Sequence, residues 1–212
     1  MKKTLLLAGV ACLFASQANA EGYFFKPYLG LDYVHSWISE TDLGNDANSE
    51  KIKLKEDNMS AGQIALGVKF HPNFAFEAFY AQSDKIESTN TWLSIDADGV
   101  SETTAKISEK YSVIGADFIG SVPVMDGLEF LGSLGAGHYR IKNSVTGAYT
   151  YDRVYFDTYS NSESSNKWGV RVGVGAQYYL TDYLALRGMV RMSRIDSNGS
   201  LTDLTAGVRV YF

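Results

Sequence analysis

Residues 167–180 read Lys-Trp-Gly-Val-Arg-Val-Gly-Val-Gly-Ala-Gln-Tyr-Tyr-Leu, and their two-residue period decides the fold. The apolar positions run from Trp168 to Leu180, and the alternate positions, from Lys167 to Tyr179, carry lysine, arginine, glycine, glutamine and tyrosine. Successive side chains of a β-strand point to opposite faces, so this period predicts a strand with one apolar and one polar face. After a short break the alternation resumes over 184–192, which predicts a hairpin of two long strands. Alternation alone fits either a soluble sandwich or a membrane barrel.

The end of the chain favours the membrane. The segment 203–212 repeats the alternation and stops on an aromatic residue, with Val208, Val210 and Phe212 on the apolar face and Arg209 on the other. Such a segment resembles the terminal strand of bacterial outer-membrane β-barrels. The resemblance implies that Val208, Val210 and Phe212 form a signal for the outer-membrane assembly machinery.

The start of the chain predicts export. Residues 1–20 combine a basic start, an apolar run over 4–16 and the small-residue site Ala-Asn-Ala at 18–20. This pattern is typical of a cleaved secretory signal peptide, so we expect the mature chain to begin at Glu21. The only cysteine, Cys12, falls inside this leader, and the mature chain is therefore expected to contain no disulfide.

Composition narrows the class of protein. The 212 residues carry a net charge of −5, which argues against nucleic acid as a partner. Twenty glycines and 14 tyrosines stand against 3 prolines, and no helical period follows residue 20. An exported chain with strands throughout suits a transmembrane barrel, because only a closed barrel satisfies the backbone hydrogen bonds of strands in lipid.

The alternating segments predict an all-β fold, an eight-stranded antiparallel up-and-down transmembrane β-barrel over 21–212. The expected strands are 25–37, 60–70, 74–84, 106–120, 128–141, 167–180, 184–194 and 201–212. Three long external loops are expected at 38–58, 85–105 and 142–166, and a short one at 195–200. The Asp-Gly turn at 98–99 predicts that the second loop continues its strands beyond the membrane. On the fourth strand we place Asp117 inward, and the facing of the fifth strand stays open.

The charged face of each strand should line the lumen. A basic residue at the bilayer midplane costs roughly 2–4 kcal/mol, and eight strands leave an interior that side chains fill. We expect a lower ion-pair layer and a second layer that contains Asp32 and Asp203. The predicted lumen network comprises Glu77, Asp117, Arg187, Arg209 and Lys69 in the lower layer, with Arg171 and Arg191 above. Such networks are commonly structural, and a gate is the alternative.

The leader, the eight alternating strands, inward Glu77 and the terminal Val-Arg-Val-Tyr-Phe resemble the small outer-membrane barrel family of the OmpA transmembrane domain, OmpX-type proteins and opacity-type adhesins. The resemblance covers the whole mature chain. It implies a monomer in the outer membrane, in contact with lipid and lipopolysaccharide. It also implies adhesion, surface interaction or envelope integrity; the alternative is a small gated channel for solutes or small hydrophobic molecules.

The third expected loop is the candidate surface for a host or other surface ligand, because tyrosines give contact area at low entropy cost. Its aromatic residues are Tyr149, Tyr151, Tyr155, Phe156 and Tyr159. The competing interpretation is that these rings stack on strand extensions or join the interfacial aromatic girdle. An outer-membrane lipid-modifying enzyme is the weakest alternative, because His35 and His138 belong to no recognisable catalytic motif. We expect no enzyme activity, cofactor or metal.

Overall fold

The computed structural model describes residues 25–39, 58–96, 99–151, 155–195 and 199–212. The expected signal peptide lies outside the described residues. Most of the expected first loop and the middle of the short fourth loop lie outside them as well. No helix in the described part of the chain is long and apolar enough to cross a membrane.

The described residues form nine strand segments. They are β1 (Lys26–Ser39), β2 (Asn58–His71), β3 (Phe74–Ser83), β4 (Ile86–Asp96), β5 (Gly99–Met125), β6 (Leu128–Tyr151), β7 (Tyr155–Tyr179), β8 (Leu184–Ile195) and β9 (Gly199–Tyr211). Every pairing between them is antiparallel. β3 and β4 both pair with β5, so they are successive parts of one strand that is interrupted at residues 84–85. The predicted eight-stranded meander is therefore confirmed.

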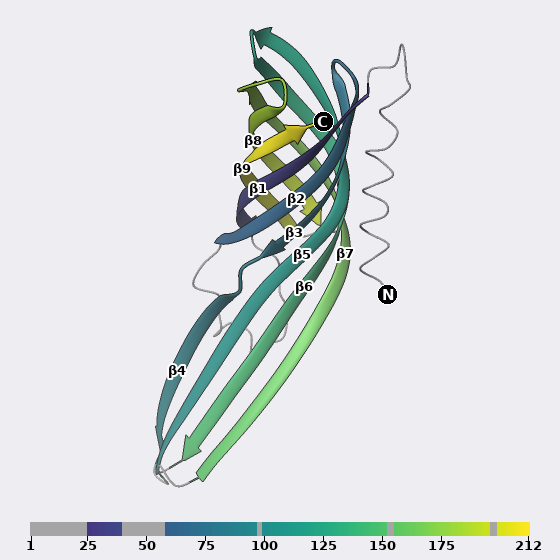
Figure 1. The fold of residues 1–212 in the computed structure, drawn as a ribbon. Coiled ribbons are helices and arrows are strands. Elements are labelled where there is room, and N and C mark those ends of the chain that lie inside the picture. The colour runs from purple at the N-terminus through teal and green to yellow at the C-terminus, as the bar shows by residue number, and fades with distance from the viewer. Residues whose placement is uncertain (1–24, 40–57, 97–98, 152–154, 196–198) are drawn as a thin grey trace.

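The sheet closes into a ring. β1 pairs with β2 on one side and with the last strand, β9, on the other, while β3 pairs with β5. Closure gives every strand of the ring two neighbours, so no backbone edge faces the lipid. Three tight turns, at residues 72–73, 126–127 and 180–183, lie at one end of the ring together with the start of β1 and the end of β9 (Figure 1).

The two faces of the strands differ as the alternation predicts. Outward apolar side chains are exposed on strand after strand, including Leu31, Ile114 and Val174 at 53%, 62% and 68%. Inward Asp117 is fully buried, which confirms the expected facing of the fourth strand. On the fifth strand Leu134 points outward and Leu131 inward, which settles the facing that the sequence left open.

Four strands continue far beyond the ring at the end away from the tight turns (Figure 1). β6 runs on to Tyr151 and β7 begins at Tyr155, so the segment expected as a loop at 142–166 is mostly paired strand. The side chains of residues 157–166 are exposed on both faces, so serines and asparagines replace the two-residue apolar period there. The backbone ladder is nevertheless continuous. β4 and the first half of β5 also pair beyond the ring, where the sequence predicts that the strands continue. We call β4 with residues 99–112, 140–151 and 155–167 the extension.

Two apolar clusters fill the interior of the ring, one on each side of a charged layer. The cluster near the tight turns contains Tyr28, Ala75, Ile119, Leu131, Ala185, Met189 and Tyr211. The other contains Val34, Met59, Ala61, Ala65, Phe79, Ala81, Tyr111, Val113, Tyr139 and Leu201. On β3, Glu77 lies between Ala75 and Phe79, and on β5 Asp117 lies between Val113 and Ile119. The charged layer around Glu77 and Asp117 thus lies between the two apolar clusters.

Gly67 and Gly62 on β2 provide a test of this packing. A Cβ at Gly67 would overlap the ring of Tyr28, whereas a Cβ at Gly62 has no neighbour within 4 Å. We expect Gly67→Ala to lower the free energy of unfolding by about 1–3 kcal/mol through overpacking. Gly62→Ala should change it by less than about 0.5 kcal/mol. Urea unfolding in lipid vesicles measures both, and equal midpoints would contradict the packing described here.

Candidate functional site

Glu77 is the centre of the charged layer and is fully buried. Arg187 donates to its Oε2 at 2.7 Å, and the Tyr28 hydroxyl donates to the same oxygen at 2.9 Å. Arg209 donates to Oε2 from Nε at 3.3 Å. These donors come from β8, β1 and β9, so one carboxylate on β3 connects strands from opposite sides of the ring.

Arg209 joins Glu77 to a second acid. Its Nη1 and Nη2 donate to the two carboxylate oxygens of Asp32 at 2.7 and 2.9 Å, a bidentate pair. Gln63 donates to the same carboxylate at 2.8 Å. A Cβ on Gly30, which faces Arg209 across the strands, would lie 2.7 Å from the guanidinium carbon. Glycine there gives the guanidinium the space to reach both acids.

Asp117 belongs to a looser group. Arg171 Nη2 lies 3.2 Å and Arg191 Nε 3.7 Å from its Oδ2. Arg191 Nη2 also lies 4.0 Å from Glu77 Oε1, so this arginine is placed between the two acids. Within the described residues, neither oxygen of Asp117 accepts a hydrogen bond, and the Nε atoms of Arg171 and Arg191 donate none. This group is held by charge rather than by directed hydrogen bonds.

Basic and acidic side chains lie together inside the ring. The inward basic residues Lys69, Arg171, Arg187, Arg191 and Arg209 are accompanied by Asp32, Glu77, Asp117, Glu129 and Asp203, and Glu109 is a further buried acid. A buried charge is strongly unfavourable unless it is paired, so this mixture makes a filled interior possible. Arg171 gains a further partner in the ring of Phe79, 3.9 Å from its guanidinium carbon.

The pairing differs from the two expected layers. Asp117, expected with Glu77 and Arg187, contacts Arg171 and Arg191 instead. Counting residues from the turns ignores the stagger of neighbouring strands, which shifts the height of each side chain. Asp203 accepts a hydrogen bond from the Ser36 hydroxyl at 2.6 Å.

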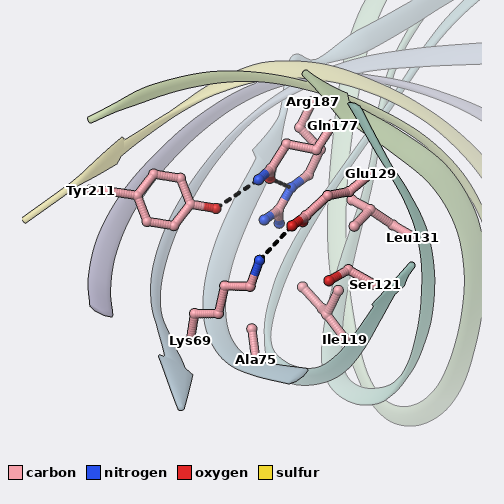
Figure 2. A pocket seen from close by; sticks show the side chains of 9 residues that line it. All are labelled: Lys69, Ala75, Ile119, Ser121, Glu129, Leu131, Gln177, Arg187 and Tyr211. Atoms are coloured by element: carbon pink, nitrogen blue, oxygen red, sulfur yellow. Dashed lines mark hydrogen bonds and ion pairs between the residues drawn. The ribbon is translucent and has the colours of Figure 1, made fainter. Parts of the chain in front are cut away.

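Lys69 lies apart from the central layer. It donates to Glu129 at 2.7 Å and to the Tyr179 hydroxyl at 3.2 Å, near the tight turns. Figure 2 shows Lys69 and Glu129 beside a small pocket. Gln177 and Tyr211 also line this pocket, and Gln177 donates a hydrogen bond to the Tyr211 hydroxyl. Sequence reasoning missed Glu129, Gln177 and Tyr28 as partners, although each occupies a polar-face position of its strand.

The other predicted site residues lie on the extension or at the end of β9. Tyr159 is half-exposed and its ring lies over Gly147 of β6, its partner in register. The backbones of Tyr149, Tyr151, Tyr155 and Phe156 belong to β6 and β7, and their side chains lie outside the described part. In the proposed assembly signal, Val210 and Phe212 face outward and Val208 is partly exposed.

The three histidines have aromatic neighbours. His35 packs edge-on against Trp37 with ring centroids 4.6 Å apart, and His138 packs in the same way against Trp168 at 5.2 Å. His71 lies in the tight turn, where its Nδ1 accepts the backbone N–H of Asn73. The described residues contain no group of three or more histidine, cysteine, aspartate or glutamate side chains that could hold a metal ion.

The burial of Glu77 leads to a stability prediction. Glu77→Ala would leave Arg187 and Arg209 without their shared partner, so we expect the free energy of unfolding to fall by about 3–5 kcal/mol. Glu87→Ala is the matched control, because Glu87 also pairs with two basic residues but is exposed on the extension. Its unfolding midpoint in urea should stay close to that of the unchanged protein. Equal losses in the two variants would show that burial does not govern this network.

Two structural neighbours share the fold. Neisserial surface protein A (NspA) is 20% identical to this chain with a TM-score of 0.54, and the alignment covers 91% of this chain and 100% of that one. Ail, the attachment invasion locus protein of Yersinia pestis, is 16% identical with a TM-score of 0.52, and 88% of this chain covers 98% of that one. A second Ail structure, in complex with the heparin analogue sucrose octasulfate, has a TM-score of 0.51. No curated protein sequence matches the chain.

At these identities the neighbours show the fold alone, and the family comes from the sequence. The model of the outer membrane protein beta-barrel domain matches residues 5–212, nearly the whole chain. The closed ring, its apolar outer surface and its charged interior agree with that match. The chain therefore belongs to the outer membrane protein beta-barrel family and is a protein of the outer membrane.

Proposed function

We propose that this protein is a plugged membrane anchor that displays the extension for adhesion, surface interaction or envelope integrity. The observation that carries the proposal is the extension itself, four strands that continue beyond the ring (Figure 1). A barrel that served only as a pore would have no need for paired strands of this length outside the bilayer. The proposed orientation places the extension outside the cell and the tight turns in the periplasm.

The edges of the extension support a binding role. Among the described residues, β7 pairs with β8 only from Gly169 onward, so residues 155–168 pair with β6 alone. In the same part of the chain, β4 pairs only with β5. Unpaired strand edges present rows of N–H and C=O groups to which an extended peptide can add. The side chains of residues 157–166 are all exposed, so both faces of this edge are open to a partner.

The interior supports a closed barrel. Paired charges occupy the middle of the ring, and apolar clusters fill the space on both sides of them. We further propose that the protein acts as a monomer. We also propose that it has no catalytic activity, since His35 and His138 each pack against a tryptophan. The names of the neighbours, an attachment protein and a surface protein, are consistent with a surface role.

A gated channel is the second candidate, and one observation favours it. Arg191 lies 3.7 Å from Asp117 and 4.0 Å from Glu77, at hydrogen-bonding distance from neither. A cation shared between two acids has two nearby arrangements, which is what a gate requires. Its cargo would be a small solute or a small hydrophobic molecule.

Shortening the extension tests the primary proposal. Residues 145–161 are removed and Ser144 is joined to Ser162 through an Asn-Gly turn, which preserves the register because these serines are partners. We expect bacteria that display the shortened protein to adhere to cultured epithelial cells at least tenfold less than bacteria with the full protein. The unheated gel migration of both proteins reports barrel folding. Equal adherence, or no adherence of the full protein above an empty vector, would contradict the adhesive role.

Single-channel recording in a planar bilayer separates the two candidates. If the barrel is plugged, neither the unchanged protein nor Arg187→Ala should give steady conductance, because the apolar clusters still fill the lumen. Discrete openings of the unchanged protein that change in Arg187→Ala would favour the channel.

A further inference from the structure

Three basic side chains gather on the outer face of the extension where it leaves the membrane. Lys110 of β5 and Lys142 of β6 are direct partners across the two strands. Arg140 lies two residues from Lys142 along β6 and is the partner of Ser112. All three side chains are exposed. We call Lys110, Arg140 and Lys142 the basic cluster.

The register of the strands shows that the basic cluster faces the lipid side rather than the lumen. Ile114, His138 and Trp168 are partners across β5, β6 and β7, and Ile114 and Trp168 are exposed at 62% and 71%. Side chains two and four residues further along a strand keep the same face. Arg140 is two residues from His138, and Lys110 is four from Ile114.

The height of the basic cluster corresponds to the headgroup layer. A strand rises about 3.3 Å per residue and barrel strands tilt by about 40°. Arg140 therefore lies about 5 Å, and the two lysines about 10 Å, beyond the row of Trp168. Exposed tryptophan marks the interface of the hydrocarbon, and the polar region outside it is several ångströms thick. The flexible lysine stems let their ammonium groups adjust within that layer.

The basic cluster brings three like charges together on one face of the extension. Like charges directly opposite in a sheet repel, yet Lys110 and Lys142 are partners. Within the described residues, none of the three forms an ion pair. Lys106, on the same strand and face, differs because it binds Glu87 at 2.6 Å. A hydrogen bond from Lys106, together with a smaller contribution from Lys85, lowers the pKa of Glu87 to about 2. The Lys106–Glu87 pair therefore stays ionised.

We propose that the basic cluster binds the phosphate groups of the phosphorylated glycolipid, lipopolysaccharide, in the outer leaflet. A phosphate placed between Lys110 and Lys142 would convert their repulsion into two attractive contacts, and Arg140 can hold a phosphate bidentately. The position beside Trp168, at headgroup height, favours a lipid phosphate over free phosphate or a soluble polyanion. The proposal holds whether the lumen is closed or gated.

The test measures how much lipid A co-purifies with the refolded full chain from mixed micelles, by mass spectrometry. Lys110→Gln is compared with Lys106→Gln, the same substitution four residues away, and with the triple variant that also carries Arg140→Gln and Lys142→Gln. We expect the triple variant to retain at most a tenth of the lipid A, Lys110→Gln an intermediate amount, and Lys106→Gln the full amount. Unheated gel migration confirms that each variant is folded.

The form of the ligand separates the possible sources of phosphate. Dephosphorylated lipid A should bind the unchanged protein as weakly as lipid A binds the triple variant. Equal retention of lipid A by the triple variant and the unchanged protein would overturn the proposal, and so would equal binding of dephosphorylated lipid A. Displacement of lipid A by inorganic phosphate alone would point to a free anion. Binding of a sulfated polysaccharide, with no binding of lipid A, would replace the lipid with a soluble polyanion.

Discussion

The structure depends on one constraint, the neutralisation of a carboxylate that the barrel wall has removed from water. Glu77 is fully buried, and Arg187, Arg209 and Tyr28 all direct their donors at it. An isolated charge in such a place would be strongly unfavourable, so the strands that carry these groups must keep their register. A slip of one residue would take each donor to the lipid face, where a guanidinium is also unfavourable.

The fold was predictable from the sequence because the two-residue period reports directly on the two environments of a barrel strand. The alternate positions of Leu31, Ile114 and Val174 along their strands were enough to place them against lipid. The position of Asp117 along its strand was likewise enough to place it inside. The pairing of the charges was less predictable. Asp117 meets Arg171 and Arg191 rather than Arg187, because the stagger between strands sets height and leaves no local signal in the sequence.

The extension marks the second limit of sequence reasoning. When both faces of a strand are exposed to solvent, no hydrophobic period remains. The sequence of the serine-rich residues 157–166 therefore resembles that of a loop. The paired backbone makes them a strand all the same. The same loss of period hid the basic cluster, since only the register shows that Lys110 and Lys142 are partners. The arrangement of residues beyond the ring is therefore better identified from strand pairing than from hydrophobic periodicity.

The closure of the ring has a consequence for the order of folding. The bidentate partner of Asp32 is 177 residues away, and the partners of Glu77 on β8 and β9 are 110 and 132 residues away. The first three strands therefore carry acids whose counter-charges are made last. Contacts of such long sequence separation form slowly, because the entropy of closing the loop is lost before the contact is gained. The ion pairs of Asp32 and Glu77 are therefore complete only after the final strand has docked.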